Sequence, residues 1–200
     1  MSLAMWAAVT THETSKIHFG CLLAETYDDW VSVVHQALDL TLRTMSENPE
    51  LRKERKEDEI TIEVVGNLRK YPIEVEHDAK VGGHTDFLVR GENGYAWLAE
   101  AKKYTSNSWI HQGYQQLTTR YGNPTPVSNR GAIIIYSYDD RLDRTMDSWR
   151  DYLSAKEPSA TCAAIGPDRI SFASSQAHAR NGMPYEIRHV GLSLYFDPKK

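Results

Sequence analysis

Residues 83–103 constrain the fold more than any other part of the chain. They read GHTDFLVRGENGYAWLAEAKK, in which two apolar runs flank the turn Glu92-Asn93-Gly94. Short apolar runs bounded by turn residues are typical of strands. Glycine at the end of a three-residue loop adopts, without steric cost, the left-handed conformation that closes such a turn. The sequence therefore predicts an antiparallel hairpin here.

The length of the turn also predicts the register of the hairpin. Counting outward from the turn pairs Leu88 with Leu98 and Asp86 with Glu100. Directly opposite residues on antiparallel strands have Cβ atoms roughly 4.5–5.5 Å apart. Lys102 is expected on the same face as Glu100, because strand side chains alternate between faces. A register shifted by one residue would put the two carboxylates on opposite faces.

The pairing of Asp86 with Glu100 predicts a chemistry as well as a fold. Two carboxylates this close repel each other, and burying them is costly unless a cation lies between them. Mg²⁺ prefers oxygen ligands, commonly one or two carboxylates with water and substrate phosphate. Lys102 would bring an ammonium into the same space, where it can hold a phosphate oxygen or a metal-bound water. This pattern predicts metal-assisted hydrolysis of a phosphodiester.

These residues resemble the PD-(D/E)xK nuclease superfamily, which includes restriction enzymes, Holliday-junction resolvases and RecB-like nucleases. The matching elements are Asp86 and the tripeptide Glu100-Ala101-Lys102, while Thr85 stands where the family's name has Pro. The resemblance implies an α/β, restriction-endonuclease-like αβββαβ core with a mixed central sheet flanked by helices. It also implies that Asp86, Glu100 and the Ala101 carbonyl bind Mg²⁺, with Mn²⁺ as a substitute, and that Lys102 assists catalysis.

The helix expected before the hairpin supplies a further candidate ligand. Residues 59–71 are predicted to be helical, since Ile60, Val64 and Leu68 recur at helical spacing. In the superfamily the first core helix often sends one Glu toward the metal. The resemblance therefore implies that Glu63 completes the metal shell, with Glu59, one turn earlier, as the second choice.

The helix expected after the hairpin, residues 109–121, supplies a candidate for the scissile phosphate. Many relatives carry a Gln-Leu pair followed by Tyr on this helix, which Gln116-Leu117 with Tyr121 approximates. Here the Tyr follows Gln116 after five residues rather than four. Gln116 is the predicted catalytic residue, and Gln112 and Gln115 stay open as alternatives.

Other residues near the hairpin have two interpretations each. His84 shares a face with Asp86 and is expected to make a hydrogen bond, with metal ligation as the alternative. Tyr104, Trp109 and Tyr114 are expected to pack in the core, and stacking on an unpaired base is the alternative.

The chain is predicted to be one nuclease-like domain. Its parts are an N-terminal helical extension (1–56), a catalytic core (57–138) and a C-terminal helix with strands (139–200). Outside the hairpin and its two helices, the patterns predict strands at 16–23, 73–76, 130–138, 170–173 and 185–196 and helices at 27–45 and 141–153. Asp28 or Asp29 is expected to cap the helix at 27–45.

Composition gives weaker constraints. The net charge is −4 and the pI about 6.1, without the basic surplus typical of nucleic-acid binders, so binding would depend on a local basic groove. No apolar run approaches the roughly 20 residues needed to cross a membrane. Two cysteines, Cys21 and Cys162, are too few for a disulfide framework and favour a reducing, cytoplasmic setting.

The sequence thus predicts a Mg²⁺-dependent endonuclease that hydrolyses DNA, in restriction, phage defence or repair, acting as a homodimer or with a partner subunit. The first alternative is a non-catalytic nuclease fold that binds DNA or protein. The second is an RNA-directed nuclease subunit that acts with a partner.

Overall fold

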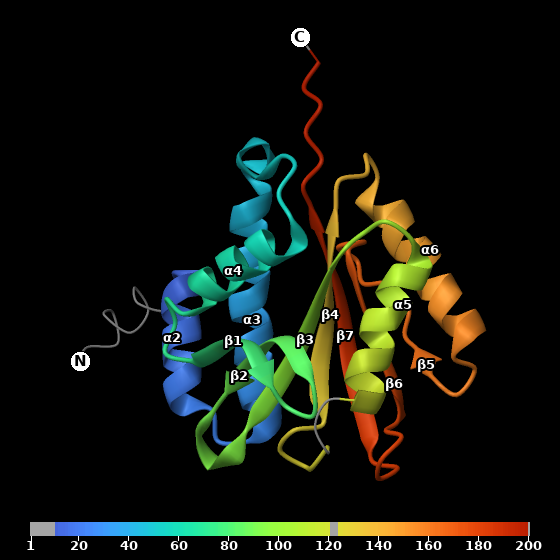
Figure 1. The fold of residues 1–200 in the computed structure, drawn as a ribbon. Coiled ribbons are helices and arrows are strands. Elements are labelled where there is room, and N and C mark those ends of the chain that lie inside the picture. Colours follow the sequence, from blue (N-terminus) through green and yellow to red (C-terminus); the bar gives the residue numbers. More distant parts are fainter. Residues whose placement is uncertain (1–10, 121–123, 200) are drawn as a thin grey trace.

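The computed structural model describes residues 11–120 and 124–199, which form an α/β fold with a mixed seven-stranded sheet between helices (Figure 1). The strands are β1 (Glu74–Lys80), β2 (His84–Arg90), β3 (Ala96–Lys103), β4 (Arg130–Ser137), β5 (Thr161–Cys162), β6 (Ser171–Ala177) and β7 (Pro184–Ser193). Their spatial order is β1-β2-β3-β4-β7-β6-β5. Strands β3, β4 and β7 are mutually parallel, and the other pairings are antiparallel.

Helices cover both faces of this sheet. They are α2 (Glu13–Leu23), α3 (Tyr27–Ser46), α4 (Glu57–Leu68), α5 (Asn107–Gln115) and α6 (Leu142–Lys156), with 3₁₀ turns η1 (Pro49–Arg52) and η2 (Glu92–Gly94) and a π turn η3 (Gln116–Arg120). Helices α2, α3 and α4 lie on one side, and α5 and α6 lie on the other (Figure 1). The predicted order of helix, three antiparallel strands, helix and strand is confirmed by α4, β1, β2, β3, α5 and β4.

The C-terminal strands continue the same sheet. Strand β7 pairs in parallel with β4 along its whole length, and β6 and β5 follow it outward. The run Gly-Ala-Ile-Ile-Ile-Tyr in β4 is consequently buried on both faces, as its continuous apolar character predicts. No helix within the described ranges is long and apolar enough to span a membrane.

Two local predictions near the N-terminus are wrong. Residues 16–23 form most of α2 rather than a strand, since Ile17 is their only β-branched residue and Gly20 lets the helix approach Val33 closely. The next helix begins at Tyr27, and its cap is Thr26 rather than an Asp. The Thr26 side chain accepts a hydrogen bond from the amide of Asp29, whose carboxylate accepts one in return.

The predicted hairpin register is confirmed for the paired residues of β2 and β3. Leu88 lies opposite Leu98, and Phe87 lies opposite Ala99. Within the turn, Gly94 is left-handed with φ 76°, as the turn type predicts. The register therefore directs Leu98 and the alternate residues after it toward α5 and α6.

Candidate active site

Strands β2 and β3 stop pairing next to Asp86 and Glu100, the two carboxylates that the sequence predicted to bind metal. Their backbone ladder ends at the pair Phe87–Ala99. Beyond it, side chains supply the hydrogen bonds: the Thr85 hydroxyl donates to the Ala99 carbonyl at 3.0 Å, and the Ala101 amide donates to Asp86 Oδ2 at 2.6 Å. Asp86 is thereby held between the two strands, with its other oxygen directed away from this bond.

Four charged side chains meet at this point of separation. Lys102 Nζ lies 2.7 Å from Glu100 Oε1, 3.5 Å from Glu57 Oε1 and 3.7 Å from Asp86 Oδ2. Glu100 and Lys102 are buried, and Glu57 and Asp86 are partly exposed. The structure thus brings together the three side chains that the hairpin pattern singled out, and adds a fourth. We call Glu57, Asp86, Glu100 and Lys102 the carboxylate cluster.

Glu57 is the member of the cluster that the sequence did not single out. It is the first residue of α4, and its Oε2 accepts hydrogen bonds from the Lys103 amide at 2.6 Å and from Trp109 Nε1 at 3.4 Å. The prediction began this helix two residues late, at Glu59. A usable signal was present, because acidic residues gather in the first turn of a helix and residues 57–59 read Glu-Asp-Glu.

The structure does not bring Glu63 to the cluster, which corrects its predicted place in the metal shell. Glu63 Oε1 lies 2.5 Å from Arg52 Nη2, and Oε2 lies 2.8 Å from Arg55 Nη1. Six residues separate it from Glu57, a rotation of roughly 240° around the helix axis. Glu63 therefore faces the arginines of the segment before α4, and we call Arg52, Arg55 and Glu63 the arginine cluster. Glu59, the second choice, accepts a hydrogen bond from the Lys56 amide instead.

Burial and charge shift the pKa values within the carboxylate cluster. Desolvation raises the pKa of Asp86, and the opposing influences of Lys102 and the Ala101 amide do not cancel it. Burial by itself lowers the pKa of Lys102, but Asp86, Glu100 and Glu57 raise it further than burial lowers it. Lys102 is therefore a cation at neutral pH. The cluster thus contains one basic side chain and three acidic side chains, each of which has an oxygen within 4 Å of Lys102 Nζ.

This donor set fits a hard divalent cation by its chemistry. Carboxylate oxygens are the ligands that Mg²⁺ and Mn²⁺ prefer, and three carboxyl groups lie within 4 Å of the Lys102 ammonium. The carboxylates converge on the Lys102 ammonium rather than on one another. Accordingly, no group of three or more His, Cys, Asp or Glu side chains in residues 11–120 and 124–199 is already arranged around a common metal position.

Helix α5 packs directly on the carboxylate cluster at Gly113. A Cβ atom at Gly113 would lie 3.1 Å from Glu100 Cγ and 3.2 Å from Lys102 Cε, closer than most real Cβ contacts. Glycine at this position therefore allows the helix to pack directly on the two buried charged side chains.

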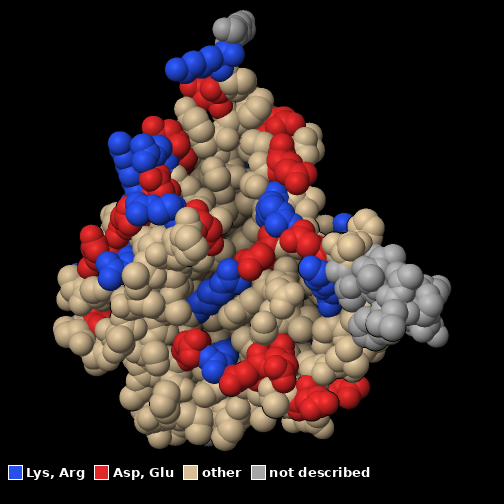
Figure 2. All heavy atoms as spheres, turned by 180° about the vertical axis from the view of Figure 1, so that it is seen from behind, with Lys and Arg blue, Asp and Glu red and all other residues tan. Residues whose placement is uncertain are grey.

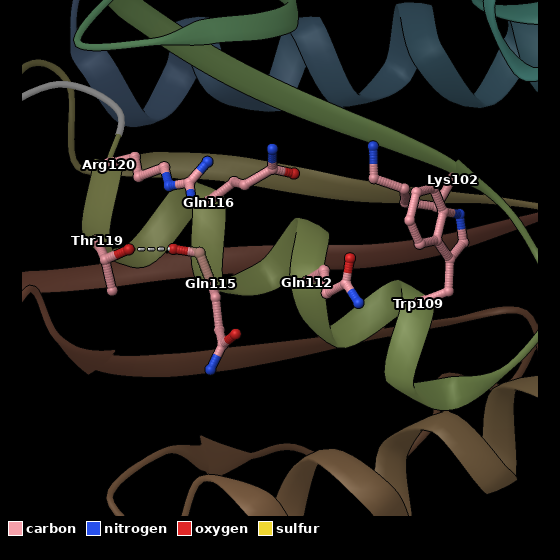
Figure 3. Close-up of a pocket in the computed structure, with 7 residues that line it drawn as sticks. All are labelled: Lys102, Trp109, Gln112, Gln115, Gln116, Thr119 and Arg120. Atoms are coloured by element: carbon pink, nitrogen blue, oxygen red, sulfur yellow. Dashed lines mark hydrogen bonds between the residues drawn. The ribbon is translucent and has the colours of Figure 1, made fainter.

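The three candidate glutamines all line a pocket beside Lys102. Gln112 and Gln115 belong to α5, and Gln116 begins the π turn that follows. In Figure 3 the Gln116 side chain extends toward Lys102, whereas that of Gln115 extends to the other side of the helix. Of the three glutamines, Gln116 therefore extends along the Lys102 side of the pocket. Tyr121, the Tyr of the predicted motif, lies outside the described residues.

Most of the remaining candidate residues lie away from the carboxylate cluster or in the core. His84 Nδ1 lies 2.8 Å from Asp78 Oδ1 at the exposed start of β2. Tyr114 is fully buried, and Tyr104 packs against the same apolar cluster, so both follow the core interpretation. Trp109 does not, because its side chain remains 37% exposed beside the pocket.

The surface carries charges of both signs. On the face drawn in Figure 2, Lys and Arg side chains lie among Asp and Glu side chains, and neither sign covers a continuous area.

No family model matches the chain, and no curated protein or solved structure matches it either.

Proposed function

We propose that the protein is a metal-dependent endonuclease that hydrolyses phosphodiester bonds in DNA. One observation carries the proposal: Glu57, Asp86 and Glu100 surround the Lys102 ammonium at the point where two strands separate, with an excess of negative charge. Isolated charge clusters of this kind are costly to bury. A cluster that leaves charge uncompensated is typical of a site that binds an ion or a substrate.

Each side chain has a role that follows from its surroundings. Asp86, Glu100 and Glu57 would hold Mg²⁺ or Mn²⁺, with the Ala101 carbonyl as a further ligand. The bound ion supplies a more acidic water and offsets negative charge on the phosphate. The Ala101 amide donates to Asp86 Oδ2 at 2.6 Å and keeps this carboxylate oriented, and Gly113 allows α5 to pack directly on Glu100 and Lys102.

Lys102 acts as a fixed positive charge. Hydrolysis forms a P–O bond from water and breaks the P–O bond to the leaving sugar oxygen, so charge grows on the phosphate oxygens. An ammonium aimed at those oxygens stabilises the transition state more than the ground state. Its raised pKa suits this role and not that of a general base, because a base must be unprotonated. Gln116, on the pocket side of Lys102, would donate its amide to the same phosphate.

The test compares two glutamates of one helix. The full chain is incubated with supercoiled plasmid, with and without Mn²⁺, alongside the variants Glu57→Gln and Glu63→Gln. We expect Mn²⁺-dependent cleavage by the wild type and by Glu63→Gln, and loss of cleavage in Glu57→Gln. Equal cleavage by the two variants would refute the assignment of the site, and an inactive wild type would refute the nuclease.

The non-catalytic alternative has one observation in its favour. The ammonium of Lys102 already lies between the carboxylates, as it would in a cluster that only holds the fold together. Calorimetric titration with Mn²⁺ separates the two functions. Heat of binding that disappears in Glu57→Gln supports the nuclease, and an absence of binding supports a module that binds DNA or protein without cleaving it.

A further inference from the structure

The pocket beside the carboxylate cluster is large enough for a nucleotide. Its volume is about 540 Å³, and its walls are Lys102 of β3 together with one side of α5 and of the π turn η3 (Figure 3). Ligand pockets are commonly about 300–1,000 Å³. Lys102 belongs both to this pocket and to the cluster, so a ligand in the pocket lies next to the reacting phosphate of the proposed function.

The Arg120 end of the pocket favours an anion. None of the residues that line the pocket is acidic, and of its two basic residues Lys102 is shared with the carboxylate cluster whereas Arg120 is not. Arg120 forms no ion pair with any carboxylate of the described residues. Its guanidinium is therefore available to a phosphate, for which Arg provides a planar pair of donors.

Trp109 provides an aromatic surface in the same pocket. Its indole N–H donates to Glu57 Oε2 at 3.4 Å, and Lys102 Nζ lies 5.5 Å from the ring centroid. These two contacts orient the ring while the side chain stays 37% exposed. An oriented and exposed indole is suited to stacking on a flat, uncharged ring system such as a nucleobase.

Glutamine side-chain amides line the pocket between Trp109 at one end and Arg120 at the other. The side chains of Gln112 and Gln116 make no hydrogen bond to another described residue, although both line the pocket. Each amide offers donors and an acceptor, which match the edges of bases and the oxygens of phosphates. Arg120 follows Trp109 by eleven residues, which is roughly 16 Å along a helix at about 1.5 Å per residue. That length is enough for more than one nucleotide of an extended strand.

We propose that this pocket binds an unpaired nucleotide of the substrate strand, with its base stacked on Trp109 and a neighbouring phosphate held by Arg120. The inference rests on the proposed function, because it places this nucleotide beside the bond that the carboxylate cluster cleaves. Bases inside a duplex are already stacked on their neighbours and cannot present a face to the indole. The substrate class is therefore single-stranded DNA, or duplex DNA with unpaired bases at the cleaved position.

Binding is measured first, in EDTA so that no cleavage occurs. Fluorescence anisotropy of a labelled 12-nucleotide dT strand is compared with that of an abasic strand of the same length and charge and with a 12-base-pair duplex. We expect the wild type to bind the dT strand about tenfold tighter than the abasic strand. Trp109→Ala should lose that preference, and Trp109→Phe, which keeps a ring but not the N–H donated to Glu57, should retain most of it.

The matched control is Phe196→Ala, which removes another exposed aromatic ring, 45% exposed and outside the pocket. It should bind like the wild type. An unchanged preference for the dT strand in Trp109→Ala overturns the inference, and so does tighter binding to the duplex. Tighter binding to a single-stranded RNA of the same length, with the same dependence on Trp109, overturns the assignment to DNA.

Cleavage in Mn²⁺ then separates this inference from the proposed function. If the wild type cleaves duplex and single-stranded DNA equally and Trp109→Ala does the same, the nuclease stands and the inference fails. If the wild type cleaves neither substrate, the nuclease fails, and the placement of the nucleotide beside a cleaved bond fails with it. Faster cleavage of single strands, lost in Trp109→Ala, supports both.

Discussion

Helix α4 contributes to two ion clusters that differ in charge balance. In the arginine cluster, Glu63 lies between Arg52 and Arg55, and the Arg52 guanidinium also donates to the carbonyls of Met45 and Asn48 at 2.8 Å. Every charged group there has a close partner, so the cluster connects α4 to the end of α3 and to η1. In the carboxylate cluster, three acidic side chains share the single ammonium of Lys102.

The difference is the basis for proposing a structural role for one cluster and a functional role for the other. In the arginine cluster both oxygens of the single carboxylate are paired with guanidinium groups, and removing that carboxylate leaves the buried Arg52 without its ionic partner. Acidic side chains gathered in excess oppose folding, and such clusters are typical of binding and catalytic sites. The four predictions below contrast the two clusters, beginning with the largest expected effect.

Removing one charge from the carboxylate cluster should abolish cleavage. We expect Glu100→Gln, which is isosteric, to lower the rate of DNA cleavage in Mn²⁺ by about 10³-fold, because the site loses a ligand charge and Lys102 loses its 2.7 Å partner. The rate is measured on plasmid under single-turnover conditions. Circular dichroism checks that the variant is folded, and a folded variant with a wild-type rate would rule out Glu100 as a site residue.

Divalent cations should stabilise the protein through the same cluster. At an Mn²⁺ concentration 100 times its Kd, the free energy of unfolding should rise by about 2.7 kcal/mol. Thermal unfolding with and without Mn²⁺ measures this increase. Glu63→Gln should show the full increase and Glu100→Gln little of it. An equal increase in both variants would place the ion elsewhere.

Removing the charge of Glu63 should affect stability rather than activity. Glu63→Gln leaves Arg52, which is buried, without its ionic partner and should lower the free energy of unfolding by about 2 kcal/mol. Urea denaturation measures the loss. Cleavage at 25 °C should stay within about twofold of the wild-type rate, since Glu63 lies outside the site. A large loss of cleavage with unchanged stability would reverse the roles of the two clusters.

Removing the charge of Asp86 should have the smallest effect on stability, and in the opposite direction. Because desolvation raises the pKa of Asp86, its ionised form opposes folding at neutral pH. Asp86→Asn should therefore raise the free energy of unfolding at pH 7, in EDTA, by about 0.5–1 kcal/mol. Asn can still accept the Ala101 hydrogen bond.

The pH dependence follows from the same shift. A carboxyl group whose folded pKa is raised destabilises the fold above that pKa, and the penalty disappears as the pH falls through it. The advantage of Asp86→Asn should accordingly vanish in acid, where the wild-type side chain is protonated. Urea denaturation at several pH values measures this advantage, and a variant less stable than the wild type at pH 7 would show that ionised Asp86 does not oppose folding.

Much of the fold could be predicted from local patterns. The turn residues and the alternation in residues 83–103 were enough for the hairpin and for its register from Arg90–Ala96 to Phe87–Ala99, because Asn93 and Gly94 adopt the left-handed conformations that close the turn. The predicted pair of Asp86 with Glu100 lies beyond the end of this ladder. The αβββαβ order followed from apolar periodicity. The strand expected at residues 16–23 was wrong because that segment carries little periodic signal, and packing of α2 on α3 decides its structure.

The candidate site was predicted only in part. Asp86, Glu100 and Lys102 could be grouped because they belong to one hairpin, where register relates positions directly. Glu57 could not be placed in the same way. The choice of Glu57 over Glu63 depends on where α4 begins and on how the helix is rotated against β3. The acidic residues 57–59 indicate the start of the helix, but the mixed charge run of residues 50–59 gives no sign of its rotation.

The sequence by itself determined which side chains alternate on β2 and β3, since the period of a strand and the geometry of its turn are local properties. Only the tertiary structure decided that the strands separate beyond Phe87, that Glu57 joins the two carboxylates there, and that Trp109 stays exposed beside Lys102. These features arise from contacts between α4, β3 and α5. Residues so far apart in the chain are brought together by packing of the whole domain, which no local pattern encodes.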